Sequence, residues 1–495
     1  MKHIEGEDRE QIVLYEETLD SIISENNAVR FIDDYVEKMN LRSMQFKVRD
    51  SEMGRPSYTE KLLLKIYIYG YFNRIRSSRK LETECKRNIE LIWLTGRLTP
   101  DFKTIANFRK DNKEGIKKIF KEFLKICYKL DLLSFDLVGI DGTKIRAQNS
   151  NNNVYKREKI DVVLGRINHK IDEYLKEMET NDKAEKGEYE VLCGKIEDRL
   201  KNIRTRKEKV EAIKKMFEEN PELEKYFAND KESVYVKDKG SISPGYNLQA
   251  AVDNKNKLIV AIDITRESND QNQIVNMSDQ VENIKEEIGI KKEGETIKVA
   301  DAGYYSEQQI IKAQDAGHKI YVAHPVDAKK QKDSYQENPK KVPSPEYELS
   351  KFRYDKERDV YICPKEKVLN KIGGPKKDVR GKETVYYKCR ACKQCSEMVL
   401  CTKDKSGRKL QVYSRKQEID EFDKKIRSEE GKKIISMRKE ICEHPFGTIK
   451  RNFGYTYFSM KGQDSALSES SLIGFIYNLK RVLKISGIKK LMAVI

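Results

Sequence analysis

LVGIDGTKIRA, residues 137–147, is an apolar run that reaches Asp141 and then turns at Gly142. A second run of the same form, TIKVADAGYYS at 296–306, ends in Asp301. An aspartate at the end of a buried strand can reach solvent while its neighbours stay in the core, and ligands bind beyond the carboxyl ends of strands. We therefore expect Asp141 and Asp301 to share a site. The alternative is that each aspartate only caps the turn that ends its strand.

A third acid lies in the basic stretch MRKEICEHPFGTIKR, residues 437–451. Glu443 is the first choice, and Glu440, three residues earlier, is the alternative. Pro445 cannot sit inside a helix without the loss of a backbone hydrogen bond, so it is expected to start a new helix or to kink one. Two strand-end aspartates and one helical glutamate are a hard-oxygen set suited to Mg²⁺ or Mn²⁺. The plainer interpretation of Glu443 is a basic surface helix with scattered acids.

Strand and helix patterns between residues 136 and 325 alternate in the order βββαβαβ, which predicts an α/β fold with a mixed sheet. Residues 155–228 carry mixed charge at helical spacing, which predicts a helical hairpin with a mostly solvated surface. A role of this hairpin in DNA contact or dimerisation is the minor alternative. The predicted domains are an all-helical N-terminal domain (1–135), a catalytic domain (136–485) interrupted by a charged helical insertion (155–228) and a Cys-rich insertion (326–431), and a C-terminal tail (486–495).

The chain is strongly basic: 98 Lys and Arg against 81 Asp and Glu give a net charge of +17. This excess favours a polyanionic partner, of which nucleic acid is the commonest. No apolar stretch is long enough to span a bilayer, and the N-terminus lacks a signal-peptide core, so a cytoplasmic protein is expected. The N-terminal helices are equally compatible with a DNA-binding head and with simple helical packing. The predicted DNA contacts are Lys144, Arg146, Arg438, Lys439, Lys450, Arg451, Arg74 and Arg76.

Five of the nine cysteines crowd into residues 363–401. Three of them follow a C-x2-C-x2-C spacing. The five together offer more than the four thiolates that a tetrahedral Zn²⁺ needs. Free thiols on a loop-rich insertion are the alternative, and the spacing does not select four ligands from five. The five are Cys363, Cys389, Cys392, Cys395 and Cys401.

Five blocks of the sequence resemble, in order, the DDE transposases of bacterial insertion sequences. The blocks are DGTKIRA (141–147), GYNLQAAVD (245–253), ADAGYYS (300–306), EHPFGTIKR (443–451) and YNLKR (477–481). The resemblance implies an RNase H-like fold and a catalytic, Mg²⁺-binding triad of Asp141, Asp301 and Glu443. It also implies cleavage at terminal inverted repeats, joining of the 3′-OH ends to target DNA, and a homodimer that pairs two ends.

The sequence departs from one pattern of the wider group, Y-x2-R-x3-E-x6-K around the last acid. Glu443 and Lys450 fit this register, but position 436 is Ser and position 439 is Lys. The Arg role is therefore expected to pass to Lys439 or Arg438. The alternatives for function are an inactive, transposase-derived DNA-binding protein and a nuclease on the same fold that hydrolyses without strand transfer.

Overall fold

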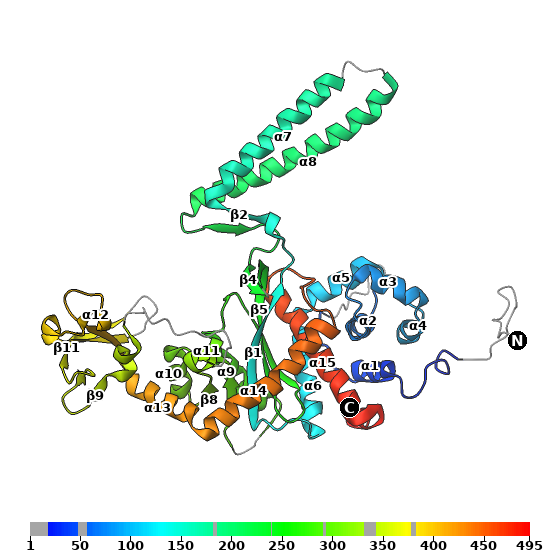
Figure 1. Cartoon of the computed structure of the whole chain (residues 1–495). Helices are drawn as coiled ribbons and strands as arrows, with labels where there is room; N and C mark the ends of the chain where they lie inside the picture. The colour runs from blue at the N-terminus through cyan, green and yellow to red at the C-terminus, as the bar shows by residue number, and fades with distance from the viewer. Residues whose placement is uncertain are drawn as a thin grey trace, which may run out of the picture.

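A computed structural model of the chain (Figure 1) describes residues 18–47, 57–181, 186–238, 240–290, 294–330, 343–377 and 383–495. Within these ranges a mixed sheet of six strands runs in the order β4-β5-β1-β7-β8, and β6 pairs with β5. The predicted mixed α/β fold is confirmed. The strands are β1 (Leu137–Arg146), β4 (Val234–Asp238), β5 (Ser241–Asp253), β6 (Ile259–Thr265), β7 (Ile297–Ala300) and β8 (Lys319–Val322).

The direction of each strand decides what lies at each end of the sheet. β5 is antiparallel to β1, β4 and β6, whereas β7 is parallel to β1 and β8 is parallel to β7. Leu137–Ile140 of β1 are buried, whereas the next four residues, from Asp141 on, are half-buried. The first half of the strand therefore lies in the core, and its polar residues begin where the core ends. In the parallel pair, Ile140 lies opposite Ala300. The next residue of each strand is an aspartate, so the two carboxylates leave the sheet at the same level.

Helices cover both faces of this sheet. Side chains alternate between faces along a strand, so positions 139 and 142 of β1 point to opposite sides. A Cβ at Gly139 would lie 2.6 Å from Cys442 Sγ in α14, whereas one at Gly142 would meet the segment that leads into α9. The missing side chain at Gly139 lets α14 approach β1 closely. The helices are α9 (Gln273–Glu287), α10 (Glu307–Asp315), α13 (Lys416–Arg427) and α14 (Glu429–Gly447).

The N-terminal helices share one hydrophobic core with the sheet region. Phe123 of α6 packs edge-to-face on Phe475 of α15 with ring centroids 5.1 Å apart, and Tyr35 of α1 stacks on the same ring at 5.6 Å. α15 in turn closes the sheet edge, because the Asn478 side chain bonds both the N–H and the C=O of Ile259. The helices are α1 (Ala28–Glu37), α2 (Glu60–Phe72), α3 (Ser78–Arg87), α4 (Ile89–Thr95), α5 (Phe102–Asp111), α6 (Lys113–Lys129) and α15 (Gln463–Met492).

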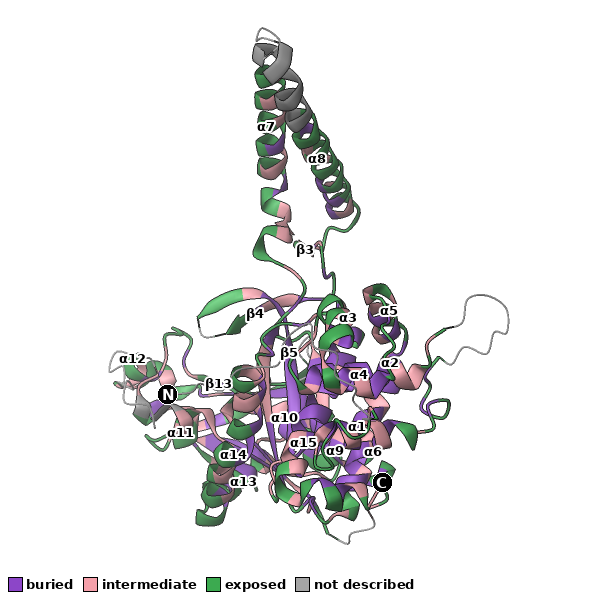
Figure 2. Cartoon of the chain, turned by 90° about the vertical axis from the view of Figure 1, so that its right-hand side faces the viewer, coloured by how far each residue is buried: buried purple, intermediate pink, exposed green. Residues whose placement is uncertain are grey.

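The charged insertion is a helical hairpin that stands off the rest of the molecule, and its described surface is mostly exposed (Figures 1 and 2). Its helices are α7 (Ile160–Asn181) and α8 (Lys186–Glu219), and a two-stranded ladder of β2 (Val154–Lys156) and β3 (Lys225–Phe227) forms its base. A small apolar core of its own, including Val210 and Phe217, holds the two helices together.

The described part of the Cys-rich insertion forms a second, antiparallel sheet of five strands in the order β13-β12-β11-β10-β9. The sequence analysis did not predict this sheet. It has a hydrophobic core separate from the main one, and residues 331–342 and 378–382 of the insertion lie outside the described residues. The elements are α11 (Pro325–Lys330), β9 (Arg353–Asp355), β10 (Val360–Ile362), β11 (Val368–Lys377), β12 (Glu383–Lys388), α12 (Met398–Cys401) and β13 (Lys409–Tyr413).

Residues 486–495, predicted to be a tail, stay helical to Met492 with a break at Gly487, where φ is 72°. Ile488 and Leu491 are buried in this segment. None of the helices in the described part of the chain is both long and apolar enough to cross a bilayer.

Candidate active site

Asp141 and Asp301 lie side by side in two hydrogen-bonded parallel strands. Asp301 directly follows the end of β7, but β1 runs on through Asp141 to Arg146, so the turn that the sequence predicted at Gly142 does not form. Asp141 lies within β1 and accepts a hydrogen bond from the N–H of Gly142 at 2.8 Å. Asp301 follows β7 directly and caps the turn Ala302–Tyr304, where its Oδ1 accepts from the N–H of Gly303 at 2.8 Å. The Asp301 carboxylate is therefore held by its turn, and the Asp141 carboxylate by the backbone of the next residue in its strand.

The electrostatics of this pair are unusual for aspartates. The pKa of Asp141 is raised to about 6: burial is the main cause, Arg438 opposes it, and the neighbouring Asp301 and Asp270 add to it. Arg438 of α14 donates from Nη1 to Asp141 Oδ2 at 2.9 Å. Of the two residues between which the sequence left the Arg role, Arg438 contacts the carboxylate pair, whereas Lys439 is 74% exposed.

The structure does not bring Glu443 to this pair. The residues of α14 that meet β1 are Arg438, Ile441 and Cys442. Five residues after Arg438, Glu443 is turned about 140° around the helix, and its side chain is 65% exposed beside Lys439 at 4.0 Å. Glu440 lies apart as well, 3.7 Å from Lys257. The helix runs through Pro445 rather than starting there, and continues as a π-helical turn at Thr448–Asn452.

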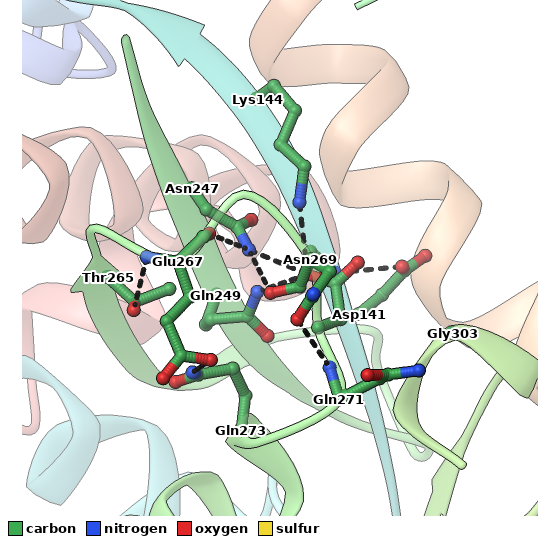
Figure 3. Close-up of polar contacts among 12 residues, drawn as sticks. Asp141, Lys144, Asn247, Gln249, Thr265, Glu267, Asn269, Gln271, Gln273 and Gly303 are labelled. Carbon is green, nitrogen blue, oxygen red and sulfur yellow. Dashed lines mark hydrogen bonds and ion pairs between the residues drawn. The ribbon is translucent and has the colours of Figure 1, made fainter. Parts of the chain in front are cut away.

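A further carboxylate, Asp270, lies near Asp141 and Asp301, and the sequence analysis missed it. Its Oδ1 accepts from Lys144 Nζ at 3.1 Å, Asn247 Nδ2 at 2.7 Å and Gln249 Nε2 at 2.7 Å. Lys144, Asn247 and Gln249 point toward one region in Figure 3. The available signal was the pattern of β5, where Asn247 and Gln249 are fully buried polar residues at alternate positions of an otherwise apolar strand.

The predicted DNA contacts divide into paired and open cations. Lys144 pairs with Asp270 and Lys450 with Asp238 at 3.1 Å each, and Arg438 pairs with Asp141. Arg76 of the N-terminal region lies 4.3 Å from the ring centre of Tyr457 and donates to its carbonyl at 2.8 Å. Arg146 bridges to the same Tyr457. The exposed residues of the set are Arg74, Arg146, Lys439 and Arg451.

The thiols of the Cys-rich insertion converge. Four of them line one cavity of about 20 Å³, roughly the room that one small ion or water requires. The Sγ of Cys363 also accepts from the N–H of Lys367 at 3.3 Å. Cys389 does not line the cavity. Its pKa is raised to about 11, chiefly by burial and also by its contact with Cys392. The four lining residues are Cys363, Cys392, Cys395 and Cys401.

Neither the carboxylates of the site nor the thiols of the insertion are positioned closely around a metal position. Over the ranges that the structure describes, no group of three or more His, Cys, Asp or Glu side chains is arranged to hold a metal. The donor chemistry still fits in both places. Burial raises the pKa of Asp141, and the nearby acids Asp301 and Asp270 add to this shift. A divalent cation would relieve the resulting cost of charge, and four thiols around one small cavity suit Zn²⁺.

Comparison with known families gives two matches. A family model described as Transposase domain (DUF772) matches residues 17–111, which include α1–α5. A second, Transposase DDE domain, matches residues 362–483, which run from the Cys-rich sheet through α14 into α15. No curated protein matches the chain.

Proposed function

The chain belongs to the insertion-sequence DDE transposases, and we propose that it cleaves DNA at the terminal inverted repeats of its element and joins the freed 3′-OH ends to target DNA. The observation that carries the proposal is the pair Asp141 and Asp301, side by side where the buried parts of two neighbouring parallel strands end. Carboxylates so placed suit two-metal transesterification, in which hydrolysis and strand transfer use one site.

Asp141 and Asp301 are the residues that would hold Mg²⁺ or Mn²⁺, which activates the attacking oxygen and stabilises the leaving one. Arg438 neutralises Asp141 in the protein without metal. Its guanidinium is also suited to a phosphate, so Arg438 can move from the carboxylate to the DNA backbone when a strand enters.

Glu443 is the third acid by resemblance to the family. In the proposed reaction it joins the pair only after a change in α14, because its side chain now points to solvent. For α14 to turn, the contacts of Ile441 and Cys442 at Gly139 would have to change together with the pair of Arg438 and Asp141. This makes Glu443 a residue of the DNA-bound state.

The proposed DNA surface runs from the carboxylate pair along the end of β1 to the N-terminal helices. The backbone of Arg146 forms a β-bridge to Tyr457, and the Arg76 guanidinium lies over the exposed ring of Tyr457, so the two regions meet at this residue. Double-stranded repeat and target DNA are the partners. Two ends must be held at once, so a homodimer is proposed, located in the cytoplasm and at the nucleoid when it is bound to DNA.

We also propose a structural Zn²⁺ in the Cys-rich sheet, held by the four thiols that line the common cavity. This ligand set leaves out Cys389. Cys363 directly follows β10, whereas Cys392, Cys395 and Cys401 come after β12. The ion would therefore join the end of β10 to the segment after β12.

The test is strand transfer. The full chain is incubated with Mg²⁺ and a plasmid that carries the DNA found on both sides of its coding sequence. Breaks at inverted repeats followed by joined products are expected. Cleavage without joining would instead indicate a nuclease, and binding without cleavage would indicate an inactive DNA-binding protein.

A further inference from the structure

We propose that Asp270 is a positioning residue of the active site. It fixes the turn that carries Asp301, and it holds Lys144 beside its own carboxylate. The proposal deepens the proposed function and rests on it for the role of the metal. Asp270 lies in the loop between β6 and α9, far in sequence from the motifs that mark the site.

A chain of hydrogen bonds links Asp270 to the Asp301 turn. Gln249 donates from Nε2 to Asp270 Oδ1, and its Oε1 accepts from the hydroxyl of Tyr304. Tyr304 is fully buried and ends the turn that Asp301 caps. Asp270 thus orients Gln249, Gln249 anchors Tyr304, and Tyr304 fixes the turn from its buried end.

Two glycines keep the space that this arrangement needs. A Cβ at Gly142 would lie 2.6 Å from Asp270 Oδ1, so any side chain there would displace the carboxylate. A Cβ at Gly303 would lie 2.9 Å from Asp301 Oδ1 and 3.7 Å from Asp270 Oδ2. Asp270 and Asp301 therefore face the same gap, which the backbone leaves open at Gly303.

The distribution of charge separates the roles of the three aspartates. Asp141 has Arg438 and Asp270 has Lys144 as partner, whereas no cation in the described part of the chain lies within 4 Å of Asp301. With its Oδ1 occupied by three donors, Asp270 acts as a fixed acceptor. Asp301 is the acid left open to a metal, and Asp270 sets the direction in which it points.

One neighbouring atom is also left open. Asn247 is fully buried, and its Nδ2 donates to Asp270, but its Oδ1 has no hydrogen-bond partner among the described residues. A buried acceptor without a partner costs about 1–3 kcal/mol. The network is therefore not arranged for stability alone, and this open acceptor beside Asp270 is available to a donor that enters the site.

The test compares Asp270→Ala and Asp270→Asn in the full chain with Asp263→Asn as the control. Asp263 accepts from Asn276 at 2.5 Å and so joins β6 to α9, as the Asp270 loop does. It lies opposite Gln249 in the β5–β6 ladder, but the bonds of its side chain go to Asn276 and Ile264 rather than to the Asp270 network. Two quantities are measured: amide hydrogen exchange over residues 297–306, and Mn²⁺ affinity by electron paramagnetic resonance.

Asp270→Ala is expected to speed exchange at residues 301–305 and to weaken Mn²⁺ binding by about 10–100-fold, the usual effect of removing a residue that orients a metal ligand. Asp270→Asn keeps an acceptor for Gln249 and should fall between Ala and wild type. Tyr304→Phe should act in the same direction, and its effect should not add to that of Asp270→Ala because both break one chain of bonds.

Unchanged exchange at 301–305 in Asp270→Ala, or an equal change in the Asp263→Asn control, would overturn the proposal. If Asp270→Ala fails to fold, Asp270→Asn decides by the same two measurements. A wild-type protein that does not bind Mn²⁺ contradicts the proposed metal chemistry instead, and the exchange data then decide on Asp270 alone.

Discussion

The carboxylate site and the cysteine cluster are both polar clusters, but they are assembled in opposite ways. The carboxylate site gathers Asp141, Asp270, Asp301 and Arg438 from four separate elements around the large sheet. The cysteine cluster draws on residues 363–401 alone, within a small sheet that has its own hydrophobic core. The first can exist only when the whole fold is in place, whereas the second depends on its own lobe. Substitutions should therefore affect chemistry at one site and local folding at the other.

The largest effect should follow a change in the carboxylate pair. Asp141→Asn or Asp301→Asn is expected to lower strand cleavage by at least about 10²–10³-fold, because a preorganised charge for the transition state is lost. DNA affinity, measured by fluorescence anisotropy, should change little. Asp263→Asn is the matched control and should cleave normally. Residual cleavage near the wild-type rate would remove the substituted aspartate from the site.

The cysteine cluster should respond in its metal content and its folding. Cys392→Ser is expected to lower bound zinc, measured by mass spectrometry of the purified chain, from about one ion to about none, since four thiolates are needed. Limited proteolysis should then cut the lobe around residues 343–413 and spare the large sheet. Cys389→Ser is the control and should retain zinc. Zinc loss in Cys389→Ser, or zinc retained in Cys392→Ser, would contradict the proposed ligand set.

A smaller effect is expected where the N-terminal helices meet the sheet. Arg146→Ala removes an exposed cation but keeps the backbone bonds to Thr456 and Phe458. DNA binding should weaken, and the slope of log affinity against log salt should shrink by about one, as for one lost phosphate contact. Lys489→Ala, an exposed cation at the far end of α15, is the comparison. Equal salt slopes for both variants would place the DNA elsewhere.

The smallest effect concerns stability, and it should have opposite signs at the two clusters. The pKa of Asp141 is raised from 3.8 to about 6, so the folded protein holds this proton more tightly than the unfolded chain. Stability is therefore lost as the pH rises from about 4 through about 6. Asp141→Asn removes that penalty, although it weakens the partner of Arg438, and should add about 1–2 kcal/mol at pH 7.5.

This gain should disappear near pH 4, where Asp141 of the folded wild-type protein is protonated and carries no charge. Denaturant unfolding at the two pH values is the measurement. Cys392→Ser should instead lose stability at pH 7.5, because its lobe no longer gains binding energy from the ion. A pH-independent gain in Asp141→Asn would show that the carboxylate is not the source of the strain.

The closeness of Asp141 and Asp301 was predictable because each follows an apolar run and the two runs form neighbouring parallel strands. The strand end at Asp141 was predicted wrongly, because β1 continues to Arg146 through its pairing with β5. The face of α14 was not predictable, since its orientation depends on Ile441 and Cys442 packing at Gly139. A motif match for Glu443 carries no information about that packing. Asp270 sits in a polar loop, ESNDQNQ, with nothing local to separate it from an ordinary turn.

The second sheet was missed for a related reason. β11 includes IGGPKK, which is exposed and shows no alternation of apolar and polar residues. Its strands are specified by pairing with β12 rather than by their own pattern. The hairpin of α7 and α8, by contrast, follows from charge at helical spacing within each segment.

The two-stranded base of that hairpin has a practical consequence. β2 and β3 bring residues 154–156 next to 225–227, and the N–H of Arg157 bonds the carbonyl of Glu224 at 3.0 Å. The chain thus departs and returns at almost the same point. Residues 158–223 could be exchanged for a tight turn to give a more compact specimen for crystallisation. The same junction could accept a fluorescent protein, so that the enzyme can be followed in cells without a label at either terminus.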